Sequence, residues 1–155
     1  PGKTFAKWGA KICANAADPF QGPKPLRALE HLSKTALFQC KDCGDCSLPD
    51  IAFLCPESQC AKNQRNGPCG GTRDGRCEVD GFGDCIWLRA YERLKSDDKE
   101  AELLAHAPAI QNQGLRGTSA WANFWLGRDH VAKREKVAKG KITMHNQEAM
   151  KKLVV

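Results

Sequence analysis

The amino-acid sequence predicts a small, irregular, α-rich domain that is stabilised by metal, in which a loop-rich cysteine region lies between flanking helices. Three observations lead to this prediction. Leu, Ile, Val and Phe together make up only 29 of the 155 residues, so the apolar core is thin. Eight of the nine cysteines fall between residues 40 and 85. Apolar residues recur at helical spacing on both sides of that region but not within it.

Length and hydropathy argue against a TIM barrel and against a membrane-spanning protein. A chain of 155 residues is the size of one ordinary domain and is too short for a TIM barrel, which needs about 200 residues or more. The longest apolar run, Ile51–Cys55, is far shorter than the roughly 20 residues of a membrane span. No signal-peptide pattern opens the sequence. We therefore expect a cytoplasmic protein without a membrane span.

The chain is expected to have three parts. Residues 1–24 form an N-terminal arm, rich in Ala, Pro and Gly and without a clean period, which wraps over this domain or over a partner. Residues 25–110 form a cysteine-rich metal-binding domain with flanking helices. Residues 111–155 form a C-terminal extension with an aromatic helix and a basic tail, which carries most of the net charge of +6.

Helices are expected before and after the cysteine region. The first spans Pro25–Phe38, because proline suits the first helical position and leucines recur at helical spacing. A second apolar helical face follows Cys85 and consists of Ile86, Trp87, Ala90, Tyr91 and Leu94. Asp97 and Glu100 have the spacing of a capping box for a short helix that ends before Pro108.

The aromatic helix contains Trp121, Phe124 and Trp125. These rings are either an exposed anchor for a partner or part of the core. Trp87 and Tyr91 are expected to pack in the core beside the metal region.

Several single residues have simpler expected roles. Cys13 is expected to be a plain thiol, because it stands apart from the other cysteines. Arg65 is expected to pair with a nearby carboxylate or carbonyl group, and Asn66 to set a turn before Gly67. His31 and His130 are expected to cap or pack rather than bind metal.

The cysteine content favours metal over disulfide bonds. Cytosolic thiols stay reduced, and an odd number of cysteines does not suit a fully paired framework. All four histidines lie outside the cysteine region, so an all-thiolate site is expected. Its candidate metal ligands are Cys40, Cys43, Cys46, Cys55, Cys60, Cys69, Cys77 and Cys85.

The spacing of these cysteines is typical of iron–sulfur ligands. Cys40, Cys43 and Cys46 are separated by two residues each, and a further cysteine precedes a proline at Cys55–Pro56. This is the arrangement of bacterial [4Fe-4S] ferredoxins, whereas zinc ribbons usually use two separated pairs. Eight thiols suffice for two [4Fe-4S] clusters, for one cluster and one zinc ion, or for zinc alone. The spacing does not assign the ligands to individual centres.

Seven segments together resemble a known family. In chain order they are RALEHLSK (27–34), CKDCGDCSLP (40–49), FLCP (53–56), RNGPCGG (65–71), CEV (77–79), CIW (85–87) and AYER (90–93). They resemble the methylenetetrahydrofolate reductase C-terminal domain family from about Leu26 to His130. Members commonly contain CPxxCPK, where this chain has CPESQCAK.

The resemblance implies a function that the composition does not. The chain would be an electron-transfer subunit without a substrate site of its own, beside a TIM-barrel reductase subunit that binds FAD or FMN. A ferredoxin or another protein would donate the electrons. One alternative is a zinc-stabilised structural or interaction module of the reductase. A nucleic-acid-binding zinc protein is a further alternative, but the basic tail lacks interleaved aromatic residues, so no nucleic-acid partner is expected.

Overall fold

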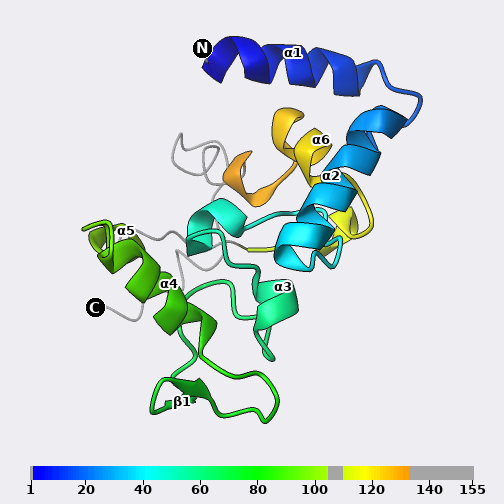
Figure 1. The fold of residues 1–155 in the computed structure, drawn as a ribbon. Coiled ribbons are helices and arrows are strands. Elements are labelled where there is room, and N and C mark those ends of the chain that lie inside the picture. The colour runs from blue at the N-terminus through cyan, green and yellow to red at the C-terminus, as the bar shows by residue number, and fades with distance from the viewer. Residues whose placement is uncertain (1, 105–109, 133–155) are drawn as a thin grey trace, which may run out of the picture.

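The computed structural model describes residues 2–104 and 110–132 (Figure 1). Two predictions lie outside these residues. One is the end of the short helix expected before Pro108, and the other is the part of the basic tail at 133–152. The elements in chain order are α1 (Gly2–Ala14), α2 (Lys24–Phe38), the 3-10 turn η1 (Leu48–Ile51), α3 (Pro56–Gln59), β1 (Thr72–Arg73), β2 (Arg76–Cys77), α4 (Ile86–Lys95), α5 (Ala101–Leu104), the 3-10 turn η2 (Gln113–Leu115) and α6 (Ala120–Trp125). The expected helix-rich, irregular fold is confirmed.

Within the N-terminal arm, Gly2–Ala14 form helix α1, which was not predicted from the sequence. α1 lies across α6 (Figure 1). The Phe5 ring packs edge-on against Trp125, with 5.9 Å between the ring centroids. Gly9 allows this approach, because a Cβ atom there would lie 2.6 Å from the Trp125 ring. Aromatic packing between the two helices therefore holds the arm on the domain.

The helix expected at 25–38 is confirmed as α2, with Pro25 in its first turn. The helix ends where Gln39 adopts a left-handed conformation, with φ 53°. A surface helix usually buries its apolar side and exposes its polar side, but α2 does the reverse. The inward side buries the polar residues Glu30 and Lys34. The exposed side carries the large apolar residues Leu29, Leu32 and Leu37, which are 58%, 70% and 73% exposed.

The cysteine region consists mostly of loops, as expected. Its regular structure is limited to η1, the one-turn helix α3, and a hairpin in which β1 pairs antiparallel with β2 and Thr72 lies opposite Cys77. The region is bounded by α2 on one side and α4 on the other (Figure 1).

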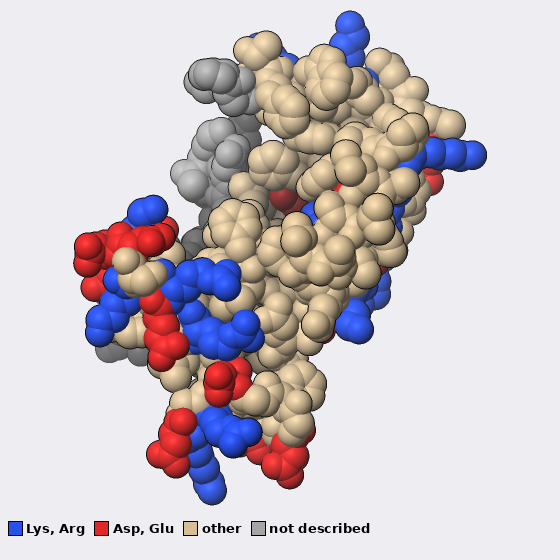
Figure 2. Space-filling view, in the orientation of Figure 1, with Lys and Arg blue, Asp and Glu red and all other residues tan. Residues whose placement is uncertain are grey.

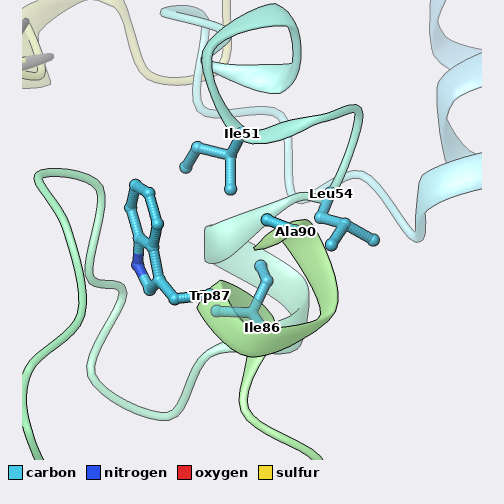
Figure 3. Close-up of a cluster of buried hydrophobic side chains, with 5 residues drawn as sticks. All are labelled: Ile51, Leu54, Ile86, Trp87 and Ala90. Atoms are coloured by element: carbon cyan, nitrogen blue, oxygen red, sulfur yellow. The ribbon is translucent and has the colours of Figure 1, made fainter. Parts of the chain in front are cut away.

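A small apolar core joins η1 to α4 (Figure 3). It consists of Ile51, Leu54, Ile86, Trp87 and Ala90. The Trp87 indole N–H donates to the Gln64 carbonyl over 3.1 Å, so the buried ring keeps a hydrogen-bond partner. Trp87 is thus in the core, as predicted.

Two details around α4 differ from expectation. Tyr91 is 40% exposed and lies beneath the Lys95 ammonium group, so its predicted core position is wrong. α5 begins at Ala101, and Asp97 lies in the turn before it rather than at its N-cap.

Charged side chains gather around α4, α5 and the hairpin, whereas the face that carries α1 and α2 is largely uncharged (Figure 2). In the part of the chain that the structure describes, no helix has the length and apolarity that a membrane span needs.

Candidate metal centres

The first group of thiols lies between α2 and the loop that follows it. Cys40, Cys43 and Cys46 line one small pocket. Burial raises the pKa of the Cys40 thiol, and Cys55 raises it further, against the lowering effect of Lys34. Burial likewise raises the pKa of Cys46, and Cys55 again adds to the effect. The thiol of Cys55 is thus close enough to interact electrostatically with both, although Cys55 does not itself line the pocket. We refer to these four cysteines as the first thiol set.

Burial disfavours ionisation of the three thiols that line the first pocket, Cys40, Cys43 and Cys46. It raises the pKa of Cys43 to about 12, although Arg65 and a hydrogen bond to the Asp45 backbone oppose this shift. A thiol must lose its proton to bind metal, and a bound cation supplies the charge that makes this favourable. The set therefore suits a cation better than it suits free thiolates.

The second group of thiols lies between α3, the hairpin and the start of α4. Cys60, Cys69, Cys77 and Cys85 line one pocket together with the core residue Trp87. Burial raises the pKa of Cys85, but hydrogen bonds from the Thr72 side chain and from backbone N–H groups at the start of α4 outweigh it and lower the pKa. These four cysteines form the second thiol set.

Each thiol set surrounds little free space. The water-accessible volume is about 10 Å³ in the first pocket and about 20 Å³ in the second. A single water needs about 10–15 Å³ of such volume, so each pocket has room for one ion of that size. Residues 2–104 and 110–132 contain no three His, Cys, Asp or Glu side chains that are already arranged to hold a metal ion. All nine thiols are free.

The loops around the second set have room to adjust. Gly67, Gly70, Gly81 and Gly83 have positive φ angles, and a Cβ atom at any of them would meet open space. Four soft thiol donors in each set fit the preferences of zinc and of iron–sulfur clusters. Each pocket has the volume of about one ion, and the thiols would have to move closer together to bind an ion or a cluster.

One histidine, which was not expected from the sequence to bind metal, lines the first pocket in the structure. His31 lies on α2, outside the cysteine region, yet it lines the same pocket as Cys40. Helix α2 also contributes Arg27, Glu30 and Lys34 to this pocket. The pocket is thus thiol-rich but not lined by thiols alone.

A buried ionic cluster of His130, Asp45 and Asp50, which lies beside the first thiol set, was also not predicted from the sequence. The His130 imidazole lies between Asp45, at 2.5 Å, and Asp50, at 2.8 Å. Burial alone would lower the pKa of His130, but the hydrogen bonds to the two carboxylates raise it to about 9. His130 is therefore charged at neutral pH and donates from both ring nitrogens. It packs between two carboxylates, in keeping with the expected packing role.

Arg65 follows its predicted role, and Cys13 and the aromatic residues of α6 differ from one another in burial. Arg65 is buried and donates to the Asp45 carbonyl over 2.7 Å, so it joins the loop between Cys60 and Cys69 to the loop of the first set. Cys13 is fully buried, next to Gly22 and outside both pockets. Trp121 and Trp125 are partly buried, whereas Phe124 is 53% exposed.

The difference in burial between the cysteines predicts an order of chemical reactivity. Cys69 is the one cysteine that is classed as exposed, so we expect a maleimide to label it before the other seven pocket thiols in the protein as purified. Cys13, with no exposed surface, should react last and serves as the internal control. Mass spectrometry of digested samples over time measures the order. Labelling of Cys55 as fast as that of Cys69 would contradict the described burial.

The sequence of residues 24–113 matches the family described as methylene-tetrahydrofolate reductase C terminal. The match includes all eight pocket cysteines and ends at Gln113, earlier than the His130 limit inferred from the motifs. No curated protein and no solved structure matches the chain significantly. Since the match covers more than half of the 155 residues, the chain belongs to the methylene-tetrahydrofolate reductase C-terminal family.

Proposed function

We propose that this chain is the iron–sulfur electron-transfer component of a methylenetetrahydrofolate reductase-type complex. It passes electrons to or from a flavin, FAD or FMN, in a TIM-barrel partner. The observation that carries the proposal is the gathering of thiols at two pockets of a chain from this family: three thiols line the first pocket with Cys55 nearby, and four line the second. When bound, [4Fe-4S] clusters accept and release single electrons.

Groups around the thiols support a redox role. A backbone N–H points at a sulfur in each set: that of Asp42 at Cys40, and that of Gln64 at Cys60, both at 3.4 Å. Hydrogen bonds to sulfur and nearby positive charge are the means by which proteins adjust the potential of such centres. Lys34 supplies positive charge near the first set, and Lys62 near Cys69 and Cys77 of the second.

The outer face of α2 supports docking to the flavin-binding subunit. Leu29, Leu32 and Leu37 are exposed, although burying a leucine is worth about 1.5–3 kcal/mol. Leu29 also lines an apolar groove between α1 and α2, and the surrounding surface is largely uncharged (Figure 2). Exposed apolar patches of this kind mark interaction sites. The face lies on the same helix whose buried side lines the first thiol pocket.

A charge on this face should prevent docking. We expect Leu32→Glu to weaken binding of the flavin-binding reductase subunit at least tenfold, because a carboxylate would have to lose its water in an apolar interface. Because Leu32 is 70% exposed, the fold itself should not change. Tyr91→Glu on α4 is the matched control and should bind normally. Co-purification and calorimetry measure the effect, and equal affinity of both variants would exclude this face.

A zinc-stabilised structural module is the second candidate function. The small pocket volumes, about 10 and 20 Å³, favour it because they are closer to the size of a single ion than to that of a cluster. Zn²⁺ has no redox chemistry, so the chain would then stabilise the reductase or its interface.

Metal analysis of anaerobically purified protein separates the two functions. The electron-transfer proposal predicts a brown protein with about eight iron atoms and eight sulfides per chain, four of each per cluster. It also predicts an electron paramagnetic resonance signal on reduction. A colourless protein that contains zinc alone would contradict the electron-transfer proposal and support the structural one.

A further inference from the structure

The loop that carries Cys40, Cys43 and Cys46 makes its hydrogen bonds to a distant segment. The loop has no regular secondary structure, so its buried backbone groups need partners elsewhere. The Gly117 N–H donates to the Asp42 carbonyl over 2.8 Å, and the Asn123 side chain donates to the Gly44 carbonyl over 2.8 Å. Asn123 has no exposed surface. The backbone on both sides of Cys43 is thus held from the segment 112–130.

The carboxylate of Asp45, just before Cys46, is held by the same segment. One oxygen accepts from the Asn112 N–H over 2.8 Å, and the other accepts from the His130 N–H over 3.1 Å and from its ring. The second ring nitrogen of His130 contacts Asp50 on η1. The chain continues from η1 to Cys55, so His130 ties together the two stretches that supply the first thiol set.

Packing between loop and segment is close as well as polar. Gly44 adopts φ +71°, and a Cβ atom there would overlap the Leu115 carbonyl oxygen. The segment is joined to α2 by Ser119, whose hydroxyl donates to Glu30 over 2.5 Å. The backbone of the hairpin, in contrast, is held by bonds within residues 71–85, such as Cys77 N–H to the Gly83 carbonyl.

We propose that residues 112–130, which lie almost wholly beyond the family match, form a clamp that sets the geometry of the first thiol set. Asn123 and His130 are its positioning residues: they bind no metal but hold the backbone from which the Cys43 and Cys46 thiols project. This inference rests on the proposed role of the thiols as metal ligands. Loss of partners that orient metal ligands typically lowers affinity about 10–100-fold.

The test is a titration of the metal-free full-length chain with Co²⁺, whose thiolate complexes absorb light. The unaltered chain should bind two ions. Asn123→Ala and His130→Ala should each weaken one binding event by about 10–100-fold and leave the other unchanged. His130→Asn should recover much of the loss, because its amide N–H can replace the ring N–H that faces Asp45. Gln113→Ala, an exposed change in the same segment, is the matched control.

The outcomes separate this inference from the proposed function. Fewer than two Co²⁺ ions bound by the unaltered chain would overturn the thiol-metal sites themselves. Two ions bound with unchanged affinities in both alanine variants, or an equal weakening of both events, would overturn the clamp while the metal sites stand. If His130→Ala does not fold, Asn123→Ala carries the test, since it removes side-chain hydrogen bonds and introduces no buried charge.

Discussion

Replacing Cys46 by serine is expected to remove one of two metal centres and leave the other intact. Its thiol lines the first pocket with Cys40 and Cys43, whereas the second set lies around the hairpin. A hard hydroxyl is a poor substitute for a thiolate ligand. Metal content per chain should fall to about half, and unfolding should become easier because metal binding is coupled to folding. Elemental analysis and denaturant unfolding measure the two effects.

Variants at other cysteines test the assignment of ligands. Cys77→Ser should remove the other half of the metal, and the double variant Cys46→Ser with Cys77→Ser should retain none. Cys13→Ala is the matched control, a buried thiol outside both pockets, and should keep the full metal content. If the double variant loses no more metal than either single variant, the two cysteines share a centre and the assignment is wrong.

Glu30→Ala is expected to lower the free energy of unfolding by about 3–5 kcal/mol, the cost of breaking a buried ion pair from one side. Glu30 is 1% exposed and accepts hydrogen bonds from Lys34 over 2.7 Å, from the Ser119 hydroxyl over 2.5 Å and from the Trp121 N–H over 3.1 Å. Its removal would leave the charge of Lys34, which is 9% exposed, without its partner carboxylate. It would also release α6 from α2.

Urea unfolding followed by circular dichroism measures this change. The matched control is Glu92→Ala, an exposed glutamate on α4, which should change stability by less than about 0.5 kcal/mol. A cost at Glu30 no larger than at Glu92 would show that the cluster does not stabilise the fold.

The sequence predicted those elements that have a strong local signal. α2, α4 and α6 follow from apolar residues at helical spacing. α1 was not predicted, although lysines at positions 3, 7 and 11 lie four residues apart and form one polar face of the helix. The outward direction of the α2 leucines could not be predicted either, since periodicity identifies a face but not what the face contacts. Here the polar side is turned inward by Glu30, whose partners lie on α6.

At the candidate site too, contacts between residues close in sequence could be expected from local patterns, whereas contacts between distant residues could not. The evenly spaced Cys40, Cys43 and Cys46 line one pocket, although the sequence left the assignment of ligands to centres open. The assignment of Cys55 to that set and of Cys60 to the other depends on how the chain folds around α3. The contact between Asp45 and His130 joins residues 85 positions apart, and no local pattern indicates such a pair.

The central claim is that the two thiol sets bind metal through sulfur. X-ray absorption spectroscopy at the edge of whichever metal the purified protein contains tests it most directly. The account predicts a first shell of about four sulfur atoms per metal at about 2.3 Å for thiolate ligands of zinc, and an additional metal–metal distance where the metal is clustered iron. A first shell dominated by nitrogen or oxygen, or a folded protein that contains no metal, would contradict it.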